Sequence, residues 1–126
     1  MTPTASPARE LFSIQSSYLR YCKYIESRLT DADFKLPEVA RAFQVSDRYV
    51  RRVFECHHET ASGYVLRRRL DLSAHMLLDP GHRDLTILAI AIECGFSGAA
   101  YFSRCFRRRF GVMPSAFRKG RLTAAG

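Results

Sequence analysis

Residues 89–119, AIAIECGFSGAAYFSRCFRRRFGVMPSAFRK, carry the pattern that decides the fold of this chain. Just before and within this stretch, apolar residues recur at the spacing of one helical face, at Ile87, Ile90, Ala91 and Cys94. Thr86 is suited to cap the start of that helix, and Gly95 to end it with a left-handed backbone. Ser97 is expected to open a second helix. The stretch therefore predicts two helices separated by a tight turn.

The second of these helices has an apolar and a polar face. The residues expected to point inward are Phe102, Cys105 and Phe106, and those expected to point outward are Ala100, Ser103, Arg104 and Arg107. Gly111 and Pro114 then indicate a break followed by a final helix over about residues 114–120. An outward face that contains arginine is a candidate binding surface, although a charge run on one helix is more often only solvated.

A similar pattern precedes this one by about 50 residues. A short helix is indicated by the apolar residues Leu36, Val39, Ala40 and Phe43, and a turn by residues 44–46. Ser46 can cap a further helix with Val50, Val53 and Phe54 inward and Arg48, Arg51, Arg52 and Glu55 outward. The order of Val50, Arg52 and Phe54 recurs in Phe102, Arg104 and Phe106. Two copies are too few for a solenoid, but they fit two similar units.

The remaining segments complete an all-α prediction of about seven helices. A helix over about residues 61–78, capped by Thr60 or Ser62, is expected to join the two units. An earlier helix over about residues 13–29 has its apolar stripe at Leu11, Tyr18, Cys22, Ile25 and Leu29. We expect a flexible segment over residues 1–12 and one domain over 13–120. Its helix-turn-helix units are expected at about 36–57 and 86–110.

Composition narrows the class of protein. The chain has 126 residues and a formal net charge of +8, and residues 36–126 hold fifteen Lys and Arg against eight Asp and Glu, which is +7 of that charge. Such an excess favours a polyanionic partner. No apolar run approaches the roughly 20 residues of a membrane helix, and the start, MTPTASPARE, has no export signal. Four cysteines without paired spacing fit reduced thiols, so we expect a cytoplasmic protein that does not contact the membrane.

Enzymatic and metal-dependent functions find little support in the sequence. There is no G-x-S-x-G elbow and no phosphate-binding glycine loop, so no enzyme is expected. Cys56, His57 and His58 are adjacent on one helix, where their side chains converge poorly on a metal, and no cofactor is expected. Six aromatic residues of the second unit could be read as base-stacking platforms, but their helical spacing fits a core better, and most of them are assigned to it. The six are Phe96, Tyr101, Phe102, Phe106, Phe110 and Phe117.

The stretch from Leu36 to Lys119, about two thirds of the chain, resembles the DNA-binding domain of the AraC/XylS transcription regulators. The resemblance rests on LPEVARAFQVS, on RRVF, on the helix centred on Tyr64 and above all on residues 89–119. That last block has the family's order of Gly-Phe, Arg-x-Phe, a basic run, Phe-Gly and x-Pro-x-x-Phe-Arg. The sequence departs from the family pattern at Lys35, Gln44 and Ala61, and Gln44 stands where the first turn usually has glycine.

The resemblance implies a seven-helix domain whose two recognition helices enter successive major grooves of double-stranded DNA. By position, the base-contacting residues are Arg48, Tyr49, Arg51, Arg52, Ala99, Ala100, Ser103 and Arg104. We expect Arg107, Arg108 and Lys119 to contact the DNA backbone. The resemblance also implies activation through RNA polymerase and, in many family members, a separate effector domain. Only about 35 residues precede the first unit, so a stand-alone regulator and a fragment both remain open.

Two other functional classes remain as alternatives. The first is a basic helical protein-interaction module that binds DNA without strong sequence selection, which the alanines at 99 and 100 would favour. The second is an enzyme or metal sensor that uses the cysteines and histidines. Competition binding on random against selected duplexes separates the first from a selective regulator, and metal analysis tests the second.

Overall fold

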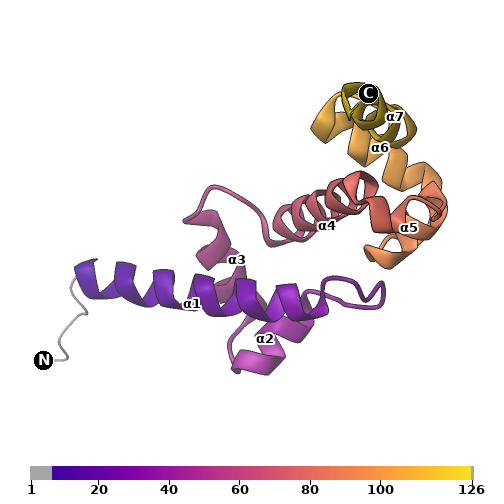
Figure 1. Cartoon of the computed structure of the whole chain (residues 1–126). Helices are drawn as coiled ribbons and strands as arrows, with labels where there is room; N and C mark the ends of the chain where they lie inside the picture. The colour runs from indigo at the N-terminus through magenta and orange to yellow at the C-terminus, as the bar shows by residue number, and fades with distance from the viewer. Residues whose placement is uncertain (1–6, 126) are drawn as a thin grey trace, which may run out of the picture. The chain divides into compact units, whose positions relative to one another are not determined.

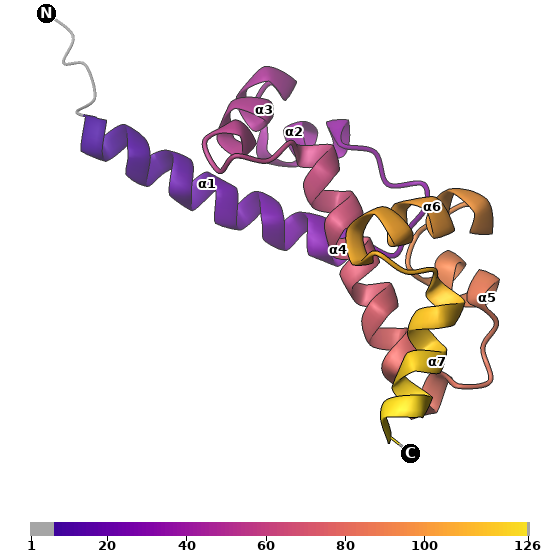
Figure 2. The same cartoon turned by 90° about the horizontal axis from the view of Figure 1, so that it is seen from above.

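A computed structural model describes residues 7–125 of the chain, with side chains described over residues 7–120. Within these bounds the structure is all-helical, as predicted, and has no strand (Figures 1 and 2). The elements in chain order are α1 (Pro7–Arg28), α2 (Pro37–Phe43), α3 (Asp47–Glu55), α4 (Ala61–Leu78), a 3₁₀ turn (Pro80–His82), α5 (Ile87–Glu93), α6 (Ala99–Phe110) and α7 (Pro114–Ala125). They form two compact units: unit 1 contains α1, α2, α3 and the start of α4, and unit 2 contains residues 29–34 and everything from Val65 onward.

Unit 1 is built around the packing of α1, α2 and α3 against one another. Its buried apolar residues are Ile14, Tyr21, Ile25, Val39, Ala40, Val50, Val53, Phe54 and Tyr64. Aromatic contacts connect the helices, since the Tyr21 ring lies 4.9 Å from that of Phe43, centroid to centroid. An ion pair of 3.1 Å between Arg28 and Glu38 joins α1 to α2 at the surface, and this hydrogen bond lowers the pKa of Glu38.

The first helix differs from its prediction in extent and in rotation. It begins at Pro7 instead of residue 13, so residues 7–12 are helical, while residues 1–6 of the predicted flexible segment lie outside the described part. Pro7 suits a first helical position because its missing N–H would have no partner there. The buried residues are Ile14, Ser17, Tyr21 and Ile25, and Leu11 is 64% exposed. The predicted stripe is confirmed at Ile25 and Leu29 but was wrong at Leu11, which lies about one turn before the first buried residue of the helix.

The turn between α2 and α3 has the local geometry that the sequence predicts. Gln44 adopts a left-handed backbone with φ 56° and ψ 45°, and its N–H bonds back to the end of α2. The Ser46 hydroxyl accepts a hydrogen bond of 3.0 Å from the N–H of Tyr49 and caps α3. At the start of α4, Thr60 caps by accepting from the Gly63 N–H at 2.9 Å, which decides between the two capping candidates at that position.

The strain at Gln44 leads to a stability prediction. Replacing Gln44 with glycine is expected to raise the free energy of unfolding by about 0.5 to 1 kcal/mol, because an L-residue is disfavoured in a left-handed conformation. The control is Ala42→Gly in the exposed last turn of α2, which should instead lower it by a few tenths of a kcal/mol up to about 1 kcal/mol. Urea titrations of both variants measure the two shifts, and a loss of stability in Gln44→Gly would contradict the assignment of strain.

Described residues of α4, α5 and α6 form an apolar core in unit 2. The core contains Leu70, Leu77, Ile90, Ala91, Cys94, Phe96, Phe102, Cys105 and Phe106, with Phe110 and Phe117 partly buried against it. This confirms the predicted inward stripes of α5 and α6. Tyr101 is the exception among the aromatic residues assigned to the core, since it is 51% exposed. The hydrogen bond and the charge of Cys105, followed by burial, raise the pKa of its hydroxyl, and Arg108 and Arg104 oppose that shift.

The caps of unit 2 follow the sequence at most positions. Thr86 accepts a hydrogen bond of 3.0 Å from the Ala89 N–H, and Gly95 and Gly111 have φ of 94° and 82° as expected for helix ends. Ser97 does not open α6. The helix starts at Ala99 after Gly98, whose extended backbone offers no side-chain cap. The final helix extends to Ala125 instead of residue 120.

Two arginines of unit 2 bind irregular segments of the chain by hydrogen bonds to backbone carbonyls. Arg69 of α4 donates from Nε to the Leu29 carbonyl at 2.8 Å and from a terminal nitrogen to the Asp31 carbonyl at 3.0 Å. Arg118 of α7 donates to the carbonyls of Leu85 and His82 at 2.8 and 3.3 Å. These contacts hold residues 29–34 and the segment before α5 in place, a role that helical periodicity alone does not reveal.

Candidate nucleic-acid interface

The second helix of unit 1, α3, separates its apolar and basic residues onto opposite faces. Val50, Val53 and Phe54 are buried, which fixes the orientation of the helix. Successive residues are 100° apart on a helix, so Arg48 and Arg52 lie together on the face opposite this core. Both side chains are exposed, and Tyr49 is half-buried at the edge of the same face. The sequence-predicted residues Arg48, Tyr49 and Arg52 are thus brought onto one surface.

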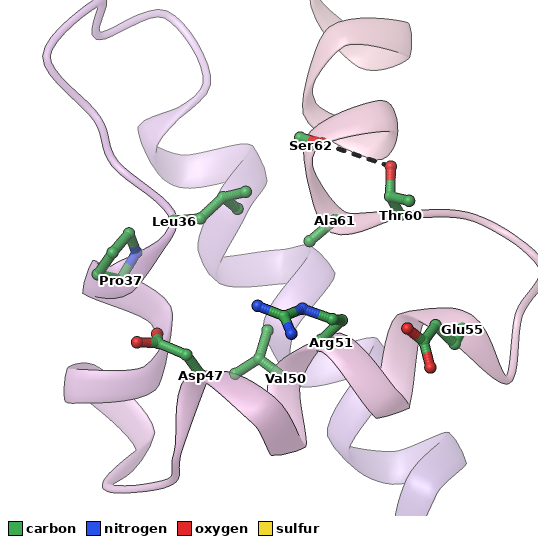
Figure 3. A pocket seen from close by; sticks show the side chains of 9 residues that line it. All are labelled: Leu36, Pro37, Asp47, Val50, Arg51, Glu55, Thr60, Ala61 and Ser62. Carbon is green, nitrogen blue, oxygen red and sulfur yellow. Dashed lines mark hydrogen bonds between the residues drawn. The ribbon is translucent and has the colours of Figure 1, made fainter.

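Arg51 occupies a different place from the other two arginines. It is exposed on the flank of α3 and lines a cleft of about 450 Å³ (Figure 3). The other lining residues are Leu36, Pro37, Asp47, Val50, Glu55, Thr60, Ala61 and Ser62. Asp47 and Glu55 stand one helical turn before and after Arg51, so carboxylates share its side of the helix. Among the residues of α3, Glu55 is the carboxylate beside the outward stripe of Arg48 and Arg52.

Arg52 has a partner that the sequence did not suggest. A terminal nitrogen of its guanidinium donates to Oε1 of Glu10, in the first turns of α1, at 2.7 Å. Both side chains stay largely exposed, at 61% and 51%. Glu10 lies within the segment predicted to be flexible, which is why sequence reasoning missed it. The signal that could have found it is the single acidic residue in a run that continues the helical pattern of α1.

The second helix of unit 2, α6, repeats the arrangement of α3 with a shift of 52 residues. The two helices begin at Asp47 and Ala99, so Arg52 corresponds to Arg104 and Arg48 to Ala100. Phe102, Cys105 and Phe106 are buried, and Ala100 and Arg104 are exposed on the opposite face. Ala99 and Ser103 are half-buried on the flank that corresponds to the position of Arg51. Each helix therefore presents an outward arginine, but the side chains at the start of the second face, at residues 99 and 100, are small and uncharged.

The shift also identifies a residue that sequence reasoning placed elsewhere. Tyr101 corresponds to Tyr49, and its ring is on the surface beside Ala100 and Arg104. Tyr49 was predicted as a base-contacting residue, whereas Tyr101 was assigned to the core with its aromatic neighbours. Counting 52 residues from Tyr49 would have placed both on equivalent surfaces.

The three arginines at the end of α6 differ in their surroundings. Arg109 is held by Asp71 of α4, with contacts of 2.8 Å from Nε and 2.7 Å from a terminal nitrogen. Arg107 and Arg108 are exposed, and neither has an ion-pair partner within the described residues. Lys119 is exposed on α7. The residues predicted to contact phosphates are therefore on the surface, and the intervening Arg109 stabilises the unit.

The part of the chain that the structure describes also gives information on metal sites, reactive thiols and membrane-spanning helices. No group of three or more His, Cys, Asp or Glu side chains there could hold a metal ion. Cys94 and Cys105 are buried, and burial raises the pKa of Cys94 to about 11, so its thiol is poorly ionised at neutral pH. None of the described helices combines the length and the apolar character needed to cross a membrane.

Comparison with known proteins places this geometry in a family. Residues 39–120 match the family described as a helix-turn-helix domain. The chain is 34% identical over 125 residues to the transcriptional activator RhrA of Rhizobium meliloti (strain 1021), which covers 99% of this chain and 37% of RhrA. The chain thus spans little more than a third of the length of that relative.

Solved structures agree with this match. The C-terminal domain of AraT, a response regulator from Geobacillus stearothermophilus, has a TM-score of 0.77 and 27% identity, covering 83% of this chain and 85% of that domain. A transcriptional regulator from Chromobacterium violaceum with an AraC-type DNA-binding domain also has a TM-score of 0.77, with 25% identity, covering 85% of this chain and 93% of that protein. The chain therefore belongs to the helix-turn-helix family of the AraC/XylS type.

Proposed function

We propose that this chain binds double-stranded DNA with sequence selectivity and regulates transcription, as an activator. The observation that carries the proposal is the repeat of one surface on α3 and α6, each with an arginine opposite a buried core. The second helix of a helix-turn-helix enters the major groove, where an arginine can donate to both O6 and N7 of guanine. The charge of +8 supplies the attraction to phosphates that such a complex needs.

The contacts divide by chemistry. In this proposal the base-contacting residues of the first helix are Arg48, Tyr49, Arg51 and Arg52, and those of the second are Ala99, Ala100, Ser103 and Arg104. Arg107, Arg108 and Lys119 bind phosphates. The second helix offers one guanidinium plus small side chains, so its readout rests on Arg104, on methyl contacts to thymine and on local DNA shape. Its half-site is therefore the more degenerate one.

The wider role is proposed by analogy with relatives. RhrA is named a transcriptional activator, and contact with RNA polymerase would provide the means of activation in this chain as well. An effector domain, in the same polypeptide or separate from it, would supply the signal, since relatives are longer than this chain. Such a regulator acts in the cytoplasm, needs no cofactor for binding and catalyses no reaction.

A selection experiment tests the central claim. Duplexes bound from a random pool should converge on an asymmetric site with one sharp and one degenerate half, and the selected duplex should bind about a thousandfold or more tighter than random duplex at physiological salt. Equal affinity for both would instead support the competing function, a basic module without site selection, which the alanines at 99 and 100 favour. A symmetric palindrome would contradict two unequal recognition helices in one chain.

A further inference from the structure

The recognition helix of unit 1 receives a carboxylate from outside the helix-turn-helix. Glu10 is on α1 and Arg52 on α3, 42 residues apart in sequence, yet Oε1 of Glu10 lies 2.7 Å from a terminal nitrogen of Arg52. We propose that Glu10 is a positioning residue, which holds the Arg52 guanidinium ready for one base and thereby sets the selectivity of the first helix. This inference rests on the proposed function, because it concerns the accuracy of the same DNA contact.

The part of α1 that follows Glu10 is anchored in unit 1. Ile14, Ser17 and Tyr21 on the following turns are buried in unit 1. Further along, the Tyr18 ring stacks on His57 at 3.6 Å and meets Phe54, in α3 itself, edge-on at 5.3 Å. The helix carrying the carboxylate is thus packed against the helix carrying the arginine, and the ion pair adds a contact between two helices that already pack together.

The geometry of the pair leaves Arg52 able to bind DNA. A guanidinium has five N–H donors, and Glu10 engages one of its terminal nitrogens. Arg52 is still 61% exposed, so the remaining donors are accessible on the outward face beside Arg48. A carboxylate that restrains a long side chain reduces the rotamer freedom that would otherwise be lost when the arginine docks on a base.

Unit 2 provides an internal comparison. Arg104 corresponds to Arg52, but no carboxylate pairs with it among the described side chains. A guanidinium that is not held can turn to a neighbouring base or to a phosphate at little cost. Of two equivalent arginines, Arg52 is therefore expected to discriminate more sharply between bases than Arg104.

The test measures discrimination rather than affinity alone. For wild type and Glu10→Gln, dissociation constants are measured on the selected duplex and on duplexes substituted at each position. Glu10→Gln is expected to reduce discrimination about 3- to 10-fold at the one base pair that depends on Arg52, and to leave other positions unchanged. Asp84→Asn, in the exposed segment before α5, removes the same charge in unit 2 and should leave discrimination as in wild type.

A double variant shows whether the effect passes through Arg52. In an Arg52→Ala background, Glu10→Gln should have no further effect on discrimination at that position. Unchanged or sharper discrimination in Glu10→Gln would overturn the inference, as would a loss that persists without Arg52. If wild type itself does not distinguish selected from random duplex, the proposed function fails and this inference fails with it. An unaltered unfolding midpoint in Glu10→Gln is expected, because the pair is at the surface.

Discussion

Replacing Arg52 with alanine is expected to weaken binding to the selected duplex about 5- to 150-fold and to relax one position of the site. The reason is that a bidentate arginine contact to guanine contributes about 1 to 3 kcal/mol of discrimination. Arg52 is exposed directly opposite the buried Val50 and Phe54, so truncation removes no packing. Equilibrium binding to the selected duplex and its single-position variants measures both effects.

Arg107 supplies the matched control for that prediction. It is an exposed arginine on the other recognition helix, and Arg107→Ala removes the same charge. As a phosphate contact it should weaken binding to all sequences by a similar factor and reduce the slope of log K against log salt by about 1. Uniform weakening in Arg52→Ala would reassign Arg52 to the backbone, and a base-specific loss in Arg107→Ala would reassign Arg107 to the bases.

Replacing Gly95 with alanine is expected to destabilise unit 2 by about 3 kcal/mol or more. Its φ of 94° is strained for any residue with a Cβ, and that Cβ would lie 2.7 Å from both the Leu29 carbonyl oxygen and Nε of Arg69. Relief of the clash would break the hydrogen bond of 2.8 Å between those two groups. Burial already lowers the pKa of Arg69, with Asp31 opposing, so loss of its partners is costly. Thermal unfolding should shift downward by roughly 10 °C or more.

A variant at Gly111 distinguishes the backbone strain from the steric clash, the two causes of the expected loss of stability. Gly111 also has a positive φ, of 82°, but a Cβ there would meet nothing within 4 Å. Gly111→Ala should therefore lose only the backbone contribution, about 1 kcal/mol. If the two variants lose the same free energy of unfolding, the close packing of Gly95 against Arg69 contributes nothing to the loss in Gly95→Ala. The loss of DNA binding in Gly95→Ala should follow the unfolded fraction and disappear at low temperature.

Local signals in the sequence were sufficient for the elements that carry the proposed interface. The capping hydroxyls at Ser46 and Thr86 and the left-handed residues Gln44 and Gly95 act through bonds within a few residues, so they can be recognised without knowledge of the fold. The inward stripes of α3 and α6 follow from helical periodicity for the same reason. Ser97 was the local signal that misled, because the N-cap position of α6 falls on Gly98, one residue further along the chain.

The sequence by itself determined the all-helical class, the two repeated helix pairs and the outward arginines, because each depends on contacts between residues close in the chain. The tertiary structure decided which face of α1 is buried, since that choice depends on the helices it meets and left Leu11 exposed. It also decided which arginines are held: Arg69 by Leu29, Arg109 by Asp71 and Arg52 by Glu10. Each of these arginines is 38 to 42 residues from its partner in the sequence. A side chain with several donors accepts whichever acceptor the fold brings within reach, so periodicity places an arginine on a surface but cannot name its partner.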